Sequence, residues 1–409
     1  MRDEVAIVGA GPAGARAAYV LARGGARVTI FDPSHPREKP CGGGVTGRAL
    51  ALVGDALAGP DGSTRWPSQV IRSARFSRLR AVGASASQVR GVAGIVDTSP
   101  WAVDSARVSL DEDALMVTSR AAFDAALVDA AVRAGAVLER VRVRDVAIER
   151  GGVRLETDAG SRHAAVVLGA DGANSLVRRR LSRAFRRDQL SIATGFFAHG
   201  VTSEEIVIEL VSNPPGYIWS FPRPEHLAIG ICGQADAGIT AATLRAMTGD
   251  WIAATGIAAG ARLEPYAWPI PSLSARDLER LDVAGPRWLL LGDAAGLVDP
   301  ITREGIFFAL ASGQWAADAW LSGGGPDAYT ARVRDEAAPE LARAARLKAG
   351  FFRPAFTGLM MHALQQSPGI RRVMADLVAG RQSYAGLKSR LLGTFEWRLA
   401  LRALRISWP

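Results

Sequence analysis

The chain has 409 residues, of which 48% are hydrophobic and 22% charged, a composition typical of a globular protein with about two domains. Its two cysteines, Cys41 and Cys232, are too few for a disulfide framework, and neither they nor the five histidines show a metal-ligand spacing, so no metal site is expected. No apolar run is long enough for a membrane-spanning helix, and the acidic residues Asp3 and Glu4 argue against a secretory signal.

The formal net charge of +9 is concentrated at the C-terminal end of the chain. Residues 341–409 contain 12 Lys and Arg but only 2 Asp and Glu, which leaves the remainder close to neutral. A nucleic-acid groove needs its positive charge organised with aromatic side chains on one face, whereas this charge falls on a helical region. Nucleic-acid binding is therefore not expected.

The first 32 residues have the pattern of a strand, a glycine turn, a helix and a second strand. Glu4–Val8 and Arg27–Phe31 are apolar runs, and Ala13–Arg23 between them is rich in alanine. The turn, Gly9–Gly14, reads GAGPAG and matches GxGxxG, in which glycines let the backbone approach a pyrophosphate at a helix N-terminus. Asp32 follows at the separation expected for a carboxylate that binds ribose hydroxyls, so dinucleotide binding is favoured over a purely structural turn.

The middle of the chain first continues this pattern and then changes. A helix is expected over Ser119–Ala134, followed by strands at Val137–Val143, Val153–Thr157 and Ala165–Leu168. From about residue 191 to residue 233, extended segments alternate with turn residues, which predicts an antiparallel sheet.

The last third begins with PRWLLLGDAAG, which predicts a buried strand entering a helix. Beyond Ser322 the chain is expected to be helical, with a break at residues 367–369. The predicted fold is therefore α/β: a Rossmann-like nucleotide-binding domain formed by residues 1–70, 105–185 and 283–330, an antiparallel-sheet substrate domain formed by 71–104 and 186–282, and a C-terminal helical region, 331–409.

Two further motifs suggest which nucleotide is bound. GADGANSLVR at 169–178 and LLLGDAA at 289–295 each follow a predicted strand. With the N-terminal fingerprint, they resemble the flavoproteins that include aromatic hydroxylases and geranylgeranyl reductases, in which the second aspartate, here Asp293, binds the ribityl chain. Since no second GxGxxG is present, the resemblance implies FAD. Purely structural roles remain open, as a turn residue for Asp171 and a helix cap for Asp293.

Three stretches resemble the geranylgeranyl reductase family within this group: KPCGGGVT at 39–46, PPGYIWSFP at 214–222 and DPITREGI at 299–306. The family signature PxxYxWxFP, followed after seven residues by a glycine, is matched by Pro214, Tyr217, Trp219, Phe221, Pro222 and Gly230. Alternation places the three aromatic residues on one face of a strand, where they either pack in the core or line a long apolar cavity; the resemblance favours the cavity. Two residues depart from the family pattern, Cys232 and Arg303, each standing where many relatives have glycine.

The resemblance implies a set of site residues. The implied FAD contacts are Gly9, Gly11, Ala13, Gly14, Asp32, Cys41, Gly42, Gly44, Arg120, Val143, Asp293, Gly305 and Ile306. The implied substrate contacts are Tyr217, Trp219, Phe221 and Cys232. The implied reaction is hydride transfer from reduced flavin to an isolated C=C bond of a prenyl or polyprenyl lipid. An unpolarised alkene also needs a proton at nearly the same time, for which Tyr217, Cys41 or a held water are candidates.

Several alternatives stay open. Cys41 is either a small residue against the cofactor or a direct participant. The electron donor is either NADPH or a ferredoxin-like protein. A FAD-dependent monooxygenase and a flavin electron-transfer protein acting on quinone are the competing functions.

The expected location is cytoplasmic, with peripheral contact at the inner face of the membrane as an option. That option rests on the C-terminal stripe of Trp397, Leu401, Leu404 and Trp408 beside Arg398, Arg402 and Arg405, which either lies on an anionic membrane or packs on the FAD domain.

Overall fold

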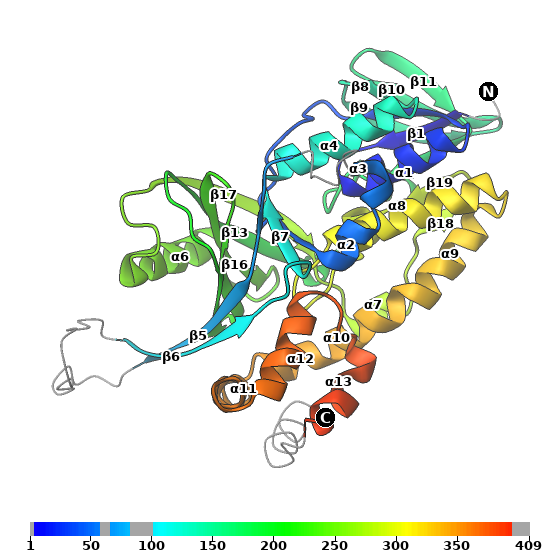
Figure 1. Ribbon diagram of the computed structural model, residues 1–409. Coiled ribbons are helices and arrows are strands. Elements are labelled where there is room, and N and C mark those ends of the chain that lie inside the picture. The colour runs from blue at the N-terminus through cyan, green and yellow to red at the C-terminus, as the bar shows by residue number, and fades with distance from the viewer. Residues whose placement is uncertain (1–3, 58–65, 82–100, 395–409) are drawn as a thin grey trace.

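The computed structural model describes residues 4–57, 66–81 and 101–394. Two large sheets lie on opposite sides of the molecule. In Figure 1 the C-terminal helices lie below and between them. The expected stripe at residues 397–408 lies outside the described residues.

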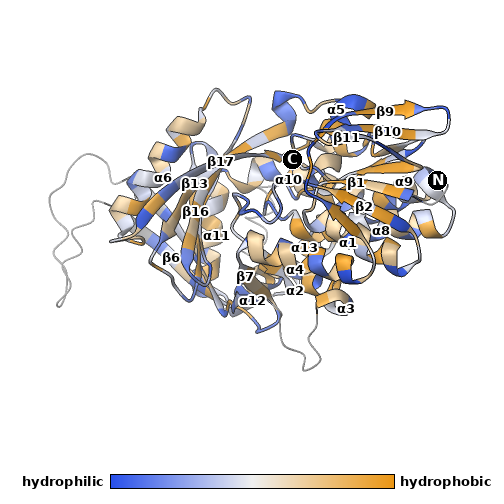
Figure 2. Cartoon of the chain, turned by 90° about the horizontal axis from the view of Figure 1, so that it is seen from above, coloured by the Kyte–Doolittle hydropathy of each residue, from blue (hydrophilic) through white to orange (hydrophobic). Residues whose placement is uncertain are grey.

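The six-stranded sheet has the order β18-β19-β12-β1-β2-β8, with all neighbours parallel except β18 and β19. The strands are β1 (Glu4–Val8), β2 (Arg27–Phe31), β8 (Val137–Glu139), β12 (Val166–Gly169), β18 (Ala284–Gly285) and β19 (Trp288–Leu290). Their side chains are apolar and buried in the centre of the sheet, as parallel strands covered on both faces require. Figure 2 shows hydrophobic colour along most of β1 and β2, although the two strands begin with the charged residues Glu4 and Arg27.

Helices α1 (Pro12–Arg23), α4 (Arg120–Arg133) and α8 (Ile306–Leu321) form one layer against this sheet, with α1 packed between the other two. Pro12 occupies the first turn of α1, where its missing N–H costs no hydrogen bond. Ser119 caps α4 by accepting a hydrogen bond from the N–H of Ala122. The small sheet β11-β10-β9 contacts the six-stranded sheet through β10 and β11; its strands are β9 (Val143–Glu149), β10 (Gly152–Thr157) and β11 (Gly160–Ala164).

The seven-stranded sheet has the order β17-β13-β16-β15-β14-β5-β6. Its strands are β5 (Ser73–Ala81), β6 (Trp101–Ser109), β13 (Leu190–His199), β14 (Ile206–Ser212), β15 (Pro215–Pro222), β16 (His226–Gln234) and β17 (Arg262–Pro271). All neighbours are antiparallel except β14 and β5, which are parallel. Helix α6 (Ala241–Thr255) covers one face of β13 and β16, so the opposite face is left for the site.

The C-terminal region consists of α9 (Gly325–Glu336), α10 (Ala338–Phe351), α11 (Pro354–Gln366), α12 (Pro368–Val378) and α13 (Tyr384–Leu392). Helix α11 packs on β5 and β6, and α12 packs on β6, through a shared cluster of buried side chains. These helices thereby close the open side of the seven-stranded sheet.

Shorter elements connect these layers. A third small sheet, β3-β7-β4, consists of β3 (Gly44–Thr46), β7 (Leu115–Thr118) and β4 (Ser68–Val70). The short helices are α2 (Gly47–Ala51), α3 (Gly54–Leu57), α5 (Leu176–Leu181) and α7 (Ala275–Leu278), with 3₁₀ turns η1 (Arg187–Gln189) and η2 (Gly292–Ala295).

The predicted fold class is confirmed, and the expected helix over 119–134 agrees with α4. The prediction of one strand over 137–143 was wrong: β8 pairs with β2, whereas β9 begins at Val143 and pairs with β10 in another sheet. The expected helix after LLLGDAAG was also wrong, because only η2 follows β19 and α8 begins at Ile306. The expected boundary between residues 104 and 105 falls inside β6.

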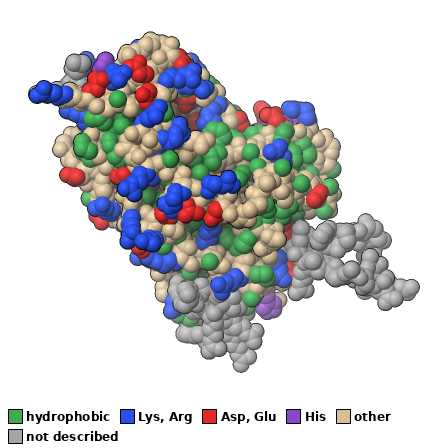
Figure 3. All heavy atoms as spheres, turned by 180° about the vertical axis from the view of Figure 1, so that it is seen from behind, with side chains coloured by type: hydrophobic (Ala, Val, Ile, Leu, Met, Phe, Trp, Pro, Cys, Tyr) green, Lys and Arg blue, Asp and Glu red, His purple; other side chains and the backbone are tan. Residues whose placement is uncertain are grey.

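Among the described residues, no helix is both long and apolar enough to cross a membrane. On the face seen in Figure 3, Lys and Arg side chains are interspersed with Asp and Glu and do not form one continuous basic band.

Candidate active site

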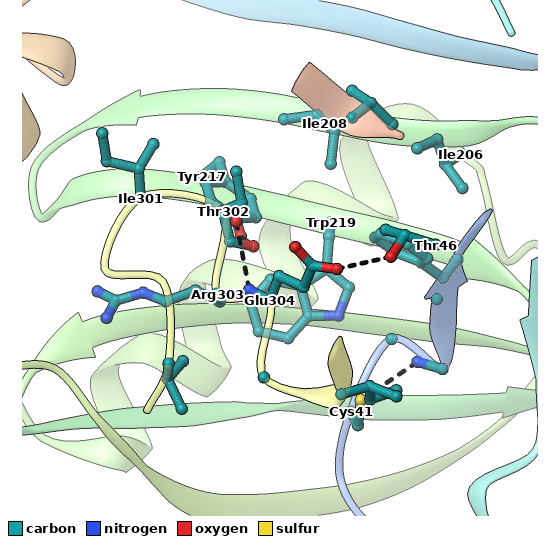
Figure 4. Close-up of a pocket in the computed structure, with 18 of the residues that line it drawn as sticks. Cys41, Thr46, Ile206, Ile208, Tyr217, Trp219, Ile301, Thr302, Arg303 and Glu304 are labelled. Carbon is teal, nitrogen blue, oxygen red and sulfur yellow. Dashed lines mark hydrogen bonds between the residues drawn. The ribbon is translucent and has the colours of Figure 1, made fainter. Parts of the chain in front are cut away.

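A cavity of about 250 Å³ lies where the seven-stranded sheet, the glycine-rich segment after β2 and the C-terminal helices meet. Its sheet wall is formed by Phe76, Ala193, Ile206, Ile208, Leu210, Tyr217, Trp219, Phe221 and Ile270. Its helical wall is formed by Phe351, Met360, Met374, Leu377 and Val378. Polar groups enter from the segment after β2, from the start of α4, from η2 and from the loop before α8, and several of them are seen in Figure 4.

The glycine turn between β1 and α1 leaves no room for side chains on its inner side. Gly9 has φ +106°, and a Cβ there would lie 2.4 Å from the carbonyl oxygen of Ala170. A Cβ on Gly14 would lie 2.1 Å from the carbonyl oxygen of Gly9, so strand and helix touch here. By contrast, a Cβ on Gly11 would meet nothing within 4 Å. The space beside Gly11, next to the first turn of α1, is therefore open, and the free N–H groups of a helix N-terminus are suited to an anion.

Asp32 stands at the end of β2 beside this turn. Its Oδ2 accepts a 2.9 Å hydrogen bond from the N–H of Ala10, and its Oδ1 accepts from the N–H and hydroxyl of Ser34. Burial alone would raise the pKa of Asp32, but these hydrogen bonds lower it below its ordinary value. The group is therefore a fixed carboxylate of the kind that binds ribose hydroxyls.

The loop that carries Cys41 packs against Phe221, which explains two of its three glycines. A Cβ on Gly42 would lie 3.0 Å from the Phe221 ring, and one on Gly44 would lie 2.9 Å from it. Gly43 has φ +81°, and its Cβ would lie 2.2 Å from the carbonyl oxygen of Thr118. The sequence explanation was close approach to a cofactor; contacts within the protein already require these glycines.

A buried ion pair holds this loop. Arg223, fully buried directly after the PxxYxWxFP signature, donates to Glu38 at 2.5 Å and to the carbonyl oxygen of Cys41 at 2.6 Å. Glu38 also accepts from the hydroxyl of Ser119 and the N–H of Arg120 at the start of α4. The pair therefore ties the loop to both the sheet and α4. Sequence reasoning missed both residues, although each adjoins a quoted motif.

Most cations on the cavity surface are paired with carboxylates. Lys39 Nζ lies 2.8 Å from Asp293 Oδ2. Arg120 is buried and forms two hydrogen bonds to Asp124 one turn later in α4. Burial opposes the charge of Arg120, but Asp124 and the neighbouring Cys41 raise its pKa above its ordinary value.

Glu304 also reaches the cavity, where it accepts a 2.7 Å hydrogen bond from the hydroxyl of Thr46 and pairs with Arg48. Sequence reasoning quoted Glu304 within DPITREGI but gave it no role. Glu304 stands immediately before Gly305, an expected FAD contact, and this position could have indicated that it lies at the site.

The three signature aromatic residues, Tyr217, Trp219 and Phe221, all line the cavity, as their alternation predicts. The Tyr217 hydroxyl donates to the carbonyl oxygen of Thr302 at 2.7 Å, and burial raises its pKa well above the ordinary value. The signature glycine, Gly230, has a steric reason: a Cβ there would lie 2.5 Å from the Trp219 ring.

Comparison with curated proteins identifies the family. The chain is 30% identical over 356 residues to the menaquinone reductase of Mycolicibacterium smegmatis, an alignment that covers 80% of this chain and 78% of that protein. The chain belongs to the geranylgeranyl reductase and menaquinone reductase family of FAD-dependent oxidoreductases. It is 29% identical to the digeranylgeranylglycerophospholipid reductase of Methanothrix thermoacetophila, over 89% of this chain and 92% of that one. It is also 29% identical to the geranylgeranyl diphosphate reductase of Rhodobacter capsulatus, over 79% of this chain and 76% of that protein.

Solved structures agree with the fold of this geranylgeranyl reductase family member. A geranylgeranyl bacteriochlorophyll reductase-like protein from Thermoplasma acidophilum superposes with a TM-score of 0.73 at 20% identity, covering 96% of this chain and 98% of that one. The halogenase PltM in complex with phloroglucinol and FAD gives a TM-score of 0.66 at 15% identity, covering all of both chains. No family model matches the sequence. The recognition from motifs is confirmed: the protein is a FAD-dependent oxidoreductase of the geranylgeranyl reductase type.

The structure brings together about half of the residues expected to contact FAD. Those that line the cavity are Cys41, Gly42, Gly44, Arg120, Asp293, Gly305 and Ile306. Gly9, Gly11, Ala13 and Gly14 lie at the turn between β1 and the start of α1, and Asp32 lies beside it after β2; all five are outside the cavity lining. The Ala13 side chain is buried beside Gly292 of η2 and its carbonyl oxygen lies beside Gly313 of α8, which leaves its backbone N–H as the group that could face a phosphate.

Val143 and Cys232 are placed differently. Val143 begins β9 and is buried in the hydrophobic core, with no contact to the cavity. Cys232 packs with Ala193 and Trp219 in a small buried cluster and does not line the cavity. Asp171 accepts hydrogen bonds from the N–H groups of Leu176 and Val177, so it caps α5. Asp293 makes no cap hydrogen bond to η2.

Proposed function

We propose that this protein uses FAD to reduce isolated C=C bonds in the prenyl chain of a lipid. One observation carries the proposal: a single cavity joins the Cys41 loop to a sheet wall of aromatic and aliphatic side chains. Such a wall suits a long hydrocarbon chain, which has no polar group to hydrogen-bond along its length. The relatives named as reductases of geranylgeranyl diphosphate and of digeranylgeranylglycerophospholipid support the same substrate class.

The residues present fit FAD. The open space before Gly11 would take a pyrophosphate, and the carboxylate of Asp32 would take the ribose. Asp293, now paired with Lys39, and the segment Gly305–Ile306 at the start of α8 would hold the part of the cofactor that enters the cavity. When bound and reduced, FAD supplies a hydride for the alkene.

The proton must come from the protein or a water it holds. The Tyr217 hydroxyl is committed to the carbonyl oxygen of Thr302, and its raised pKa makes it a weak donor. Cys41 lines the cavity, and its thiol lies beside the Arg120 cation. We therefore assign proton delivery to the Cys41 thiol: the hydride adds to one alkene carbon and the thiol proton to the other.

The helical wall excludes water from this chemistry. Phe351, Met360 and Met374 close the cavity opposite the sheet, and their unbranched or aromatic side chains can adapt to a flexible chain. This wall comes from the C-terminal region, so the region has a role at the site that does not depend on a membrane.

The test is an anaerobic reaction of the dithionite-reduced flavoprotein with geranylgeranyl diphosphate and with geranylgeraniol. We expect flavin reoxidation without oxygen, together with a product heavier by two hydrogen atoms for each bond reduced. Reoxidation that needs oxygen and yields a hydroxylated product would instead identify a monooxygenase. Quinone reduction without any change in a prenyl chain would identify an electron-transfer protein.

Cys41→Ser tests the assignment of the proton donor. We expect retained FAD and a loss of roughly 100-fold or more in alkene reduction, the usual size of a general-acid contribution. Retained FAD with full alkene reduction would contradict the assignment.

A further inference from the structure

The inward face of the seven-stranded sheet changes from apolar to polar at one end. Ala193 and Trp219 line the cavity, but Ser191, two residues before Ala193 on the same face of β13, lies opposite Gln234 of β16. The amide oxygen of Gln234 accepts hydrogen bonds from the hydroxyls of Ser191 and Ser272 at 3.3 and 3.1 Å. This polar cluster does not itself line the cavity, but it lies directly beside residues that do, Ala193 and Arg303.

Two cations converge on this polar end. The guanidinium of Arg303 donates to the Ser272 hydroxyl at 2.8 Å, and Lys348 Nζ of α10 donates to the same hydroxyl at 2.9 Å and to Gln234 at 2.8 Å. Arg303 lines the cavity, and Figure 4 shows its side chain directed away from Cys41. Within residues 4–57, 66–81 and 101–394, neither cation has a carboxylate within 4.0 Å.

Without a ligand, this arrangement of Arg303 and Lys348 destabilises the folded protein. Arg303 has φ +61°, a left-handed conformation that is strained for a residue other than glycine. Burial, and then the charge of Arg303, lower the pKa of Lys348 to about 8, although Cys232 and Asp236 act in the opposite direction. Two like charges that are partly withdrawn from water, with no described carboxylate within 4.0 Å of either, are stabilised most simply by an anionic ligand.

We propose that Arg303 and Lys348 bind a phosphate-type oxyanion at the head of the prenyl substrate. The proposal rests on the proposed function, because it places the prenyl chain in the same cavity. Within the described residues, the guanidinium of Arg303 makes one hydrogen bond to protein, so its remaining donors are available to phosphate oxygens. The site selects an anionic prenyl lipid over a prenyl alcohol or a neutral quinone.

The test compares binding to the oxidised FAD-loaded protein by calorimetry. The ligands are geranylgeranyl diphosphate, geranylgeraniol, inorganic diphosphate and NADPH. The variants are Arg303→Gly, which suits the positive φ, Arg303→Lys, which keeps the charge, and Lys348→Gln. Arg346→Gln is the matched control. Arg346 lies on α10, as Lys348 does, but it is half-exposed and paired with Glu279.

For the wild type we expect geranylgeranyl diphosphate to bind roughly 10- to 100-fold more tightly than geranylgeraniol. Arg303→Gly and Lys348→Gln each remove most of this difference and leave geranylgeraniol binding unchanged, whereas Arg303→Lys restores part of it. The control leaves the difference intact. Flavin absorbance and the thermal unfolding midpoint show that each variant is folded.

Equal wild-type binding of the two prenyl compounds would overturn the proposal, as would a preference that survives both charge-removing variants. If the variants weaken only the binding of NADPH or of inorganic diphosphate, the assignment of the site to the prenyl substrate is overturned. Reduction of geranylgeraniol, which needs no anionic group, tests the proposed function separately, so the two can fail independently.

Discussion

Positive charges are paired with carboxylates at one end of the cavity and unpaired at the other. At the end that carries Cys41, Arg120 is held by two hydrogen bonds to Asp124. At the other end, Arg303 and Lys348 share one serine hydroxyl, and no described carboxylate pairs with either. Both ends are partly withdrawn from water, so burial alone does not explain the difference.

This contrast separates positioning from recognition. Paired charges, such as Arg223 with Glu38, fix the loops that face the cofactor and leave little charge for a ligand. The unpaired cations keep their charge available and stand where a single anionic group completes the site. At one end of the cavity, ion pairs thus hold the loops in place. At the other end, unpaired cations distinguish anionic from neutral prenyl compounds.

The largest effect is expected from breaking the paired end. Glu38→Gln leaves Arg223 buried without a counter-charge, so we expect the free energy of unfolding to fall by about 3–5 kcal/mol, with loss of FAD on purification. Chemical denaturation and flavin absorbance measure the two effects. Glu112→Gln is the control, because the Arg72–Glu112 pair is exposed. A fall no greater than that of the control would show that the pair does not hold the loop.

A smaller effect is expected from crowding the loop itself. Gly44→Ala would bring a Cβ to 2.9 Å from the Phe221 ring, so we expect a destabilisation of about 1–3 kcal/mol and weaker FAD retention. Adding Phe221→Leu gives the methyl group room and should restore FAD binding. If the second change restores nothing, the space is needed by the cofactor, as the sequence explanation holds.

At the discriminating end, the rate should depend on pH through Lys348. The groups that act on this amine are Arg303, which lowers its pKa, and Cys232 and Asp236, which raise it. The charged form binds the oxyanion, so kcat/KM for geranylgeranyl diphosphate should fall as the pH rises through about 8. Lys348→Arg should remove this fall, and an unchanged profile in that variant would exclude Lys348 as its source.

The smallest effect concerns the backbone of Arg303. Arg303→Gly and Arg303→Ala both remove the charge, but only glycine relieves the positive φ. We expect the glycine variant to be more stable than the alanine variant by about 1 kcal/mol, measured by chemical denaturation. Equal stabilities would mean that the left-handed conformation is not strained.

The sequence predicted the features that depend on neighbouring residues. GAGPAG, Asp32 and the alternating aromatic side chains of β15 are local patterns, and each is found where it was expected. Arg223 and Glu38 could not be paired in advance, since they lie 185 residues apart and meet only when the segment after β2 packs against the seven-stranded sheet. The contacts of Gly42 and Gly44 with Phe221 could not be predicted either, because these residues are almost as far apart along the chain.

The C-terminal helices show the same limit. Their apolar residues predicted helices that bury one face, but not that Met360 and Met374 would close the cavity. Lys348 was likewise counted only as part of a basic region. The departure at Arg303 was visible from the motif, whereas its partner came from α10 and could not be read from spacing.

The most direct test of the account is a competition in one anaerobic reaction. The reduced flavoprotein receives equal amounts of geranylgeranyl diphosphate and a menaquinone with an unsaturated tail, and mass spectrometry follows both products. We predict that the diphosphate gains two hydrogen atoms first while the quinone tail stays unsaturated. Preferential reduction of the quinone tail would contradict the assignment of Arg303 and Lys348, and no reduction of either chain would contradict the proposed function.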